Sequence, residues 1–156
     1  MAKFQFTENL LDGITQTVRA HDTLANPLTA NDVGKFVKMT GDSQYGLCAS
    51  GDEIEGTFTT HESPKGTYDG YTLGAVTKGG RRRVTFGAIL DIGDFVVAGT
   101  VVARGTSLAG AYPTVLKEST AGAFRWRVVA RDGTTAVGQT GIIECVTGAG
   151  TGTNAA

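Results

Sequence analysis

Residue types that carry metal or acid–base chemistry are sparse in this chain and are not spaced for it. His21 and His61 have no second histidine or cysteine at ligand spacing, and Cys48 and Cys145 do not form a CxxC pair. Three acidic side chains gather in GDEIEG at 51–56, but this segment lacks the spacing of a calcium-binding hand. We therefore expect no metal ion and no other cofactor.

The motifs that resemble catalytic ones also lack their partners. GTSLA at 105–109 is similar to a nucleophile elbow. Such an elbow needs a helix after the serine, here Ser107, and a histidine further along the chain, but the sequence has no histidine after His61. GAGTG at 148–152 resembles a phosphate loop with no helix pattern behind it. The two carboxylates of a glycosidase come together only in the folded protein, so the sequence does not exclude such a pair. However, Trp126 is the only tryptophan, and no cluster of aromatic residues suggests a surface on which a sugar would stack. We predict that the protein is not an enzyme.

The elements that would position any site are short strands. The 156 residues include 23 glycines and 3 prolines, and the glycines separate short runs of Val, Ile, Phe and Thr, as in strands joined by tight turns. Apolar and polar residues alternate in Arg83-Val84-Thr85-Phe86, as in a sheet with one packed face. Strands are predicted at 35–40, 45–49, 55–61, 71–77, 81–87, 94–103, 113–117, 124–131 and 137–146.

This pattern predicts an all-β fold with one compact domain, a β-barrel or β-sandwich, over residues 31–147. Residues 1–30 are the least regular part and are predicted to form an extended N-terminal arm or edge segment. Residues 148–156 have no apolar anchor and are predicted to be a flexible, disordered tail.

One six-residue pattern occurs twice, as DVGKFV at 32–37 and DIGDFV at 91–96. Asp at the mouth of a turn can bond backbone amides, Gly34 or Gly93 permits the bend, and Phe-Val then enters a strand. We interpret the repeat as a structural device, produced either by internal duplication or by a shared turn-to-strand solution. Gly79-Gly80 is predicted to form the two-residue turn of a β-hairpin.

The net charge is −1, which argues against general binding to nucleic acids or membranes, and the N-terminus has no apolar signal region. Residues 1–70 nevertheless carry a balance of −5 and residues 71–156 one of +4. We expect strands from both halves to interleave and mix these charges. Cys48 and Cys145 are expected to be buried thiols.

The basic run Arg81-Arg82-Arg83 is the most distinctive feature expected on the surface. It either meets an acidic protein surface or phosphates, or it protects a strand edge from unwanted pairing. Arg125 and Arg127, beside Trp126, would extend the same patch.

Four segments in order carry a family resemblance: NDVGKFVKMTGD, YGLCASGDEIEGTFTTHE, GGRRRVTFGAILDIGDFVVAGTVVA and RWRVVARDGTTAVGQTGIIECV. They resemble the capsid decoration (cement) proteins of tailed bacteriophages, with a GDxV-like step at 93–96 and a VGxA-like segment at 136–139. The match covers residues 31–146. It departs from the family pattern at Gln139, where a small apolar residue is expected, and at 61–70, which reads as an insertion.

The resemblance implies a barrel or sandwich that is made in the host cytoplasm and sits on the outer surface of an expanded phage head. Its partner would be the major capsid protein, whose neighbouring subunits it would bridge, often as a homotrimer. Neither nucleic acid nor membrane is an expected partner. Candidate residues for the capsid or subunit interface are Phe4, Phe6, Leu10, Leu11, Arg81, Arg82, Arg83 and Trp126. The N-terminal residues among them serve equally well as an ordinary edge strand.

Two other classes compete. A phage tail or adhesion module with a similar sandwich would share the composition, and it should co-purify with tails. A trimeric β-barrel nucleotide pyrophosphatase would need an Asp beside a Tyr, for which Asp69 with Tyr68 or Tyr71 are the candidates. No ordered set of motifs accompanies those residues.

Overall fold

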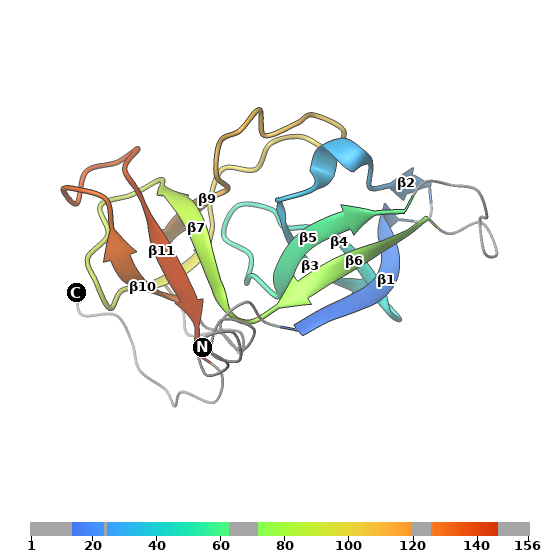
Figure 1. Ribbon diagram of the computed structural model, residues 1–156, viewed down its shortest axis with the longest axis horizontal. Coiled ribbons are helices and arrows are strands. Elements are labelled where there is room, and N and C mark those ends of the chain that lie inside the picture. The colour runs from blue at the N-terminus through green and yellow to red at the C-terminus, as the bar shows by residue number, and fades with distance from the viewer. Residues whose placement is uncertain (1–13, 24, 63–71, 120–125, 147–156) are drawn as a thin grey trace, which may run out of the picture.

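The computed structural model describes residues 14–23, 25–62, 72–119 and 126–146, which form an almost entirely β structure (Figure 1). The all-β prediction is confirmed. In chain order the elements are β1 (Ile14–Thr23), β2 (Asn26–Pro27), the 3-10 helix η1 (Ala30–Asp32), β3 (Phe36–Gly41), β4 (Gln44–Leu47), β5 (Gly56–His61), β6 (Leu73–Lys78), β7 (Arg81–Phe86), β8 (Phe95–Ala98), β9 (Thr114–Lys117), β10 (Trp126–Arg131) and β11 (Thr140–Cys145).

The strands close into two small barrels that lie side by side (Figure 1). In the first barrel the order is β1-β4-β3-β5-β6, and β6 pairs back to β1, while the short β2 lies outside β1. The β1–β4 pair is parallel and the other pairs are antiparallel. The predicted barrel is thus present, and the chain forms two of them.

The second barrel repeats the topology of the first. Its order is β7-β9-β8-β10-β11, and β11 closes onto β7. The β7–β9 pair is parallel and the others are antiparallel. Strands β7, β8, β9, β10 and β11 therefore correspond, in chain order, to β1, β3, β4, β5 and β6.

The repeated motif occupies the same place in both barrels, immediately before β3 and before β8. Gly34 and Gly93 have positive φ angles of 92° and 95°. Gly34 N–H donates to the Phe58 carbonyl and Phe58 N–H to the Lys35 carbonyl, at 2.7 and 2.9 Å. In the second copy Gly93 bonds Val128 and Val128 bonds Asp94 in the same way, at 2.8 and 2.9 Å. The predicted turn-to-strand role is confirmed for both copies.

Each barrel has an apolar interior, and the two interiors meet at the junction. Inward-facing residues of the first barrel include Val18, Tyr45, Phe58 and Val76. The larger cluster fills the second barrel and also takes in three residues of the first, Phe36, Cys48 and Ile54.

Three details of the sequence interpretation are wrong. Strand β1 lies inside the predicted N-terminal arm, yet it is a fully paired barrel strand, because Val18 and Ala20 alternate inward among polar neighbours. Gly79 and Gly80 do take positive φ angles, 69° and 73°, but β6 and β7 do not pair with each other. The glycine turn links the two barrels instead of closing a hairpin.

The third correction concerns the predicted strand 94–103, which ends at Ala98. Val101 and Val102 leave the barrel and line a hollow between the barrels. Residues 99–113, which we call the strap, form a long crossing from β8 to β9. Residues 1–13 and 148–156, where an arm and a tail were predicted, lie outside the described residues.

The charges of the two halves do not mix, contrary to expectation, because each barrel is built from one half of the chain. Among the described residues the first barrel carries seven acidic and four basic side chains, a balance of −3. The second carries five acidic and seven basic ones, a balance of +2. The asymmetry seen in the sequence is therefore an asymmetry along the molecule.

Candidate interaction surface

The strap ties the second barrel to the first. It passes over η1 before returning to β9, and is the yellow-to-orange loop across the top of Figure 1. Lys35 Nζ donates to the Ala103 carbonyl at 2.8 Å, and Gly105 N–H donates to Asp32 Oδ1 at 2.8 Å. Both anchoring side chains belong to the first copy of the motif.

Asp32 and Lys35 form a buried ion pair beneath the strap. Their charged atoms are 2.6 Å apart, and the two side chains are 0% and 3% exposed. Asp32 Oδ2 also accepts hydrogen bonds from the Thr29 N–H and hydroxyl, at 2.8 and 3.0 Å. Burial alone would raise the pKa of Asp32, but the hydrogen bonds from Lys35, Thr29 and Gly105 outweigh it and lower the pKa.

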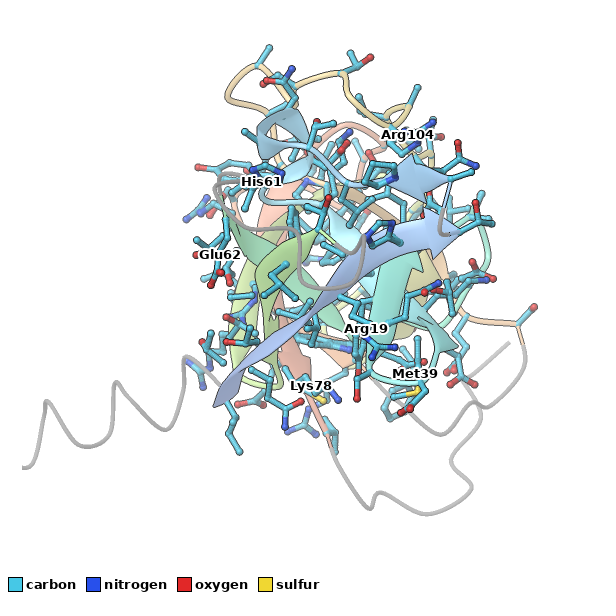
Figure 2. The ribbon with its side chains drawn as sticks, turned by 90° about the vertical axis from the view of Figure 1, so that its right-hand side faces the viewer. Arg19, Met39, His61, Glu62, Lys78 and Arg104 are labelled. Atoms are coloured by element: carbon cyan, nitrogen blue, oxygen red, sulfur yellow. The ribbon has the colours of Figure 1, made fainter. Side chains whose placement is uncertain are left out.

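Arg104 provides a second anchor, at the end of the first barrel where β2 lies. Its guanidinium donates to the Pro27 carbonyl at 3.2 Å and to Asn26 Oδ1 at 3.0 Å. A longer ion pair of 3.8 Å joins it to Asp22. Figure 2 shows Arg104 at this end.

A hollow of about 200 Å³ lies under the strap, with a largely apolar lining that includes Phe36, Cys48 and Leu108. A second one, of about 250 Å³, shares Phe36, Leu108 and Tyr112 with it and is bordered by Arg82 and Arg83. Burial, with a contribution from nearby Asp52, raises the pKa of the Cys48 thiol to about 12. Cys48 is therefore an inert packing residue here. Both cysteines are free thiols, as expected, with Cys48 buried and Cys145 half-buried.

Two of the three arginines predicted as interface residues lie on the outer face of the second barrel. Arg81 and Arg127 flank Glu144, at 3.3 and 3.5 Å. Arg83 pairs with Asp132 and stacks over the Tyr112 ring, 5.6 Å from its centroid. We call Arg81, Arg83 and Arg127 the arginine face; each side chain is nearly half exposed.

Arg82 has a different role. Its Nε donates to Thr57 Oγ1 of the first barrel at 3.2 Å, and its Nη1 donates to the Arg81 carbonyl at 2.6 Å. It therefore joins the two barrels. Strand β11 pairs with residues 81–85 of β7, whereas β9 pairs only with Thr85 and Phe86, so the second edge of the arginine run has no strand partner among the described residues, as the edge-protection alternative requires.

Trp126, also predicted as an interface residue, is a core residue. It is 1% exposed, and its indole N–H donates to the Ile54 carbonyl at 2.7 Å. The alternation of the strand placed it on the inner face, so it offers no surface to a partner. The other candidates, Phe4, Phe6, Leu10 and Leu11, lie outside the described residues.

Three of the exposed apolar side chains that the sequence did not single out lie on two loops of the second barrel. Ile89 and Ile92, between β7 and β8, are 66% and 61% exposed, and Val137, between β10 and β11, is 62% exposed. For Ile92 the available signal was the motif itself, since its second position is a turn residue in both copies. Val33, the counterpart of Ile92, is also exposed.

In the described part of the chain, no group of three or more His, Cys, Asp or Glu side chains is arranged to hold a metal ion. The same residues contain no helix that is long and apolar enough to cross a membrane. Comparison with protein-family models, with curated proteins and with solved structures finds no match for this chain.

Proposed function

We propose that the protein is a decoration protein of a tailed-phage head, without enzymatic activity. It binds on the outer surface between major capsid subunits, as a homotrimer, and stabilises the expanded, DNA-filled shell. The observation that carries the proposal is the tandem architecture: two closed barrels of one topology are tied by a strap, so each copy offers two comparable bodies to neighbouring subunits. The motif order over residues 31–146 supports the same function.

The mechanism is mechanical. Packaged DNA pushes the shell outward, and a clamp that touches several subunits must detach from them before they separate. Linked contacts act together through effective concentration, so modest interfaces suffice. Each specific contact is expected to bury about 1,200–2,000 Å². The strap and its buried ion pair would carry load between the barrels.

The second barrel presents the surface best suited to a protein partner. The arginine face carries three cations against two carboxylates, Glu144 and Asp132. Exposed arginines suit acidic protein surfaces, because a guanidinium binds carboxylates in a bidentate geometry. Ile89, Ile92 and Val137 add apolar area on the same barrel.

The test is to incubate the purified protein with expanded heads that lack it, pellet the heads and count bound copies. We expect saturation at a fixed ratio to the major capsid protein and heads that survive heating better. The double variant Arg81→Glu/Arg83→Glu should weaken binding at least about tenfold, whereas the matched variant Lys117→Glu, on β9, should not. Absence of binding, or binding only to tails, would contradict the proposal and favour a tail or adhesion module.

A further inference from the structure

The first barrel is open at one end. A hollow of about 450 Å³ opens there, lined in part by Gln16, Met39, Ser43, Tyr45 and Lys78. Figure 2 shows Met39 and Lys78 together at the end where β1 begins, away from Arg104. Met39 is half exposed.

The corresponding positions of the second barrel carry different side chains. Trp126 begins β10 as Gly56 begins β5, and Cys145 ends β11 as Lys78 ends β6. Beside Gly56 the space is taken by Val76, whose Cγ1 would lie 2.6 Å from an added Cβ, whereas the second barrel buries the indole of Trp126 at the matching position. A lysine stands in place of the thiol. The hollow of the first barrel is lined in part by hydrogen-bond donors.

Two of those donors come from Tyr45 and Lys78. The Lys78 ammonium lies 4.9 Å from the centroid of the Tyr45 ring. Tyr45 is only 2% exposed, and its hydroxyl has no hydrogen-bond partner among the described residues. A buried hydroxyl without a partner is destabilising. The same part of the chain places no carboxylate within ion-pair distance of Lys78.

We propose that this end of the first barrel binds a carboxylate attached to an apolar body. A carboxylate is an acceptor without donors, which matches an ammonium and a hydroxyl. The ammonium lies over the ring of the same tyrosine, so a carboxylate bound by Lys78 lies next to Tyr45. The Tyr45 ring and Met39 provide apolar contacts for the rest of the ligand. The proposal is independent of a capsid role.

The carboxylate has two sources, a free small acid or the carboxylate of a polypeptide, and the experiment separates them. Benzoate and a short peptide that ends in a free phenylalanine carboxylate are titrated into the full-length protein, with amide chemical shifts as the readout. Benzyl alcohol and the amidated peptide are the neutral counterparts. We expect shifts at Lys78, Tyr45 and Met39 with the two acids and none with the neutral compounds. The tighter of the two acids identifies the source.

Two variants test the assigned donors. Lys78→Met keeps the aliphatic stem, and it should weaken acid binding at least about tenfold. Tyr45→Phe keeps the ring, and it should weaken binding several-fold while leaving the free protein at least as stable, since it removes an unpartnered hydroxyl. Lys117→Met, in the second barrel, is the matched control and should bind like the unaltered protein. Equal responses to acids and neutral compounds, unchanged binding by Lys78→Met, or no response to either acid would each overturn the proposal.

Discussion

Asp32 and Asp91 begin the two copies of one motif, yet the first carboxylate is fully buried and the second is 70% exposed. The backbone after them is the same, with a left-handed glycine and a pair of bonds to the neighbouring strand. The comparison shows which motif positions specify the fold. Glycine and Phe-Val build the turn and the strand, while the first and fourth positions take on different interactions.

In the first copy these two positions, Asp32 and Lys35, pair with each other and hold the strap. In the second copy both are aspartates, and each turns to a basic side chain on another strand. Asp91 pairs with Arg131 at 3.0 Å and Asp94 with Lys117 at 3.4 Å. The second copy therefore forms two ion pairs that are more exposed than that of the first copy, and among the described residues it anchors no long crossing loop.

The largest expected effect comes from removing the buried carboxylate. Asp32→Ala leaves the Lys35 ammonium buried without its partner and strips Gly105 and Thr29 of their acceptor. We expect a loss of about 3–5 kcal/mol in the free energy of unfolding, measured by urea denaturation. Asp91→Ala breaks only an exposed pair and should cost no more than about 1 kcal/mol.

The double variant Asp32→Asn/Lys35→Met is the control for this comparison. It removes both charges, so it should recover a substantial part of the loss. Equal costs for Asp32→Ala and Asp91→Ala would show that the two copies are energetically interchangeable, against the burial difference described above.

The next largest effect tests whether the barrels are equivalent. Gly74 pairs with Val18, and Gly141 pairs with Val84 at the matching position. A Cβ at Gly74 would lie 2.4 Å from the Phe58 ring and 2.7 Å from the Thr60 carbonyl oxygen. Each glycine thus leaves room for an aromatic ring and a backbone carbonyl that pack against it.

A Cβ at Gly141 would likewise lie 2.4 Å from the Phe86 ring and 2.5 Å from the Ala130 carbonyl oxygen. We expect Gly74→Ala and Gly141→Ala each to lose about 1–3 kcal/mol by thermal or urea unfolding. If one of them is tolerated, the two barrels pack differently despite their common topology.

The strands could be predicted from the sequence where apolar residues alternate and glycines bound the run. Eight of the nine predicted ranges correspond closely to strands, from β3 to β11, and the ninth was too long. The strands that were not predicted are the two-residue β2 and β1, in which polar residues predominate and only Val18 and Ala20 mark the inner face. Strand β1 closes the first barrel. Without it, the nine predicted strands indicated one sheet structure and not two barrels.

The interaction surface was less predictable, because side-chain direction depends on partners that are distant in sequence. Arg82 and Trp126 sit in a basic and aromatic context, but the closure of the second barrel turns one toward Thr57 and the other toward Ile54. The sequence shows that Asp32 and Lys35 are three positions apart, which is close enough for an ion pair. Its burial depends on the strap, which arrives from residues some seventy positions later.

The acid dependence of stability should distinguish the barrels more finely. Because the pKa of Asp32 is lowered on folding, its charge contributes stability above its unfolded pKa of about 3.9, and this is lost as pH falls through the folded pKa. Asp132 in the second barrel also has a lowered pKa, from a hydrogen bond by Thr140, with burial opposing and Arg83 assisting.

Asp32→Asn should therefore flatten the fall in unfolding free energy below about pH 4 more than Asp132→Asn does, since Asp132 is exposed to solvent and its interactions are screened. The measurement is urea unfolding at a series of acidic pH values. A larger change in slope for Asp132→Asn would place the main acid-sensitive contact in the second barrel.

The most direct report on the strap is thiol reactivity. Burial raises the pKa of Cys48 to about 12 and raises that of half-buried Cys145 as well. At pH 8 only about one Cys48 in ten thousand is thiolate, so a thiol reagent should modify Cys145 first. Releasing the strap by Asp32→Ala should speed the modification of Cys48, which lines the hollow beneath it, and leave the modification of Cys145 nearly unchanged.

Mass-spectrometric mapping after timed labelling separates the two sites. Equal acceleration at both would mean that the variant loosens the whole molecule, and the strap would then not be a local tie between the barrels.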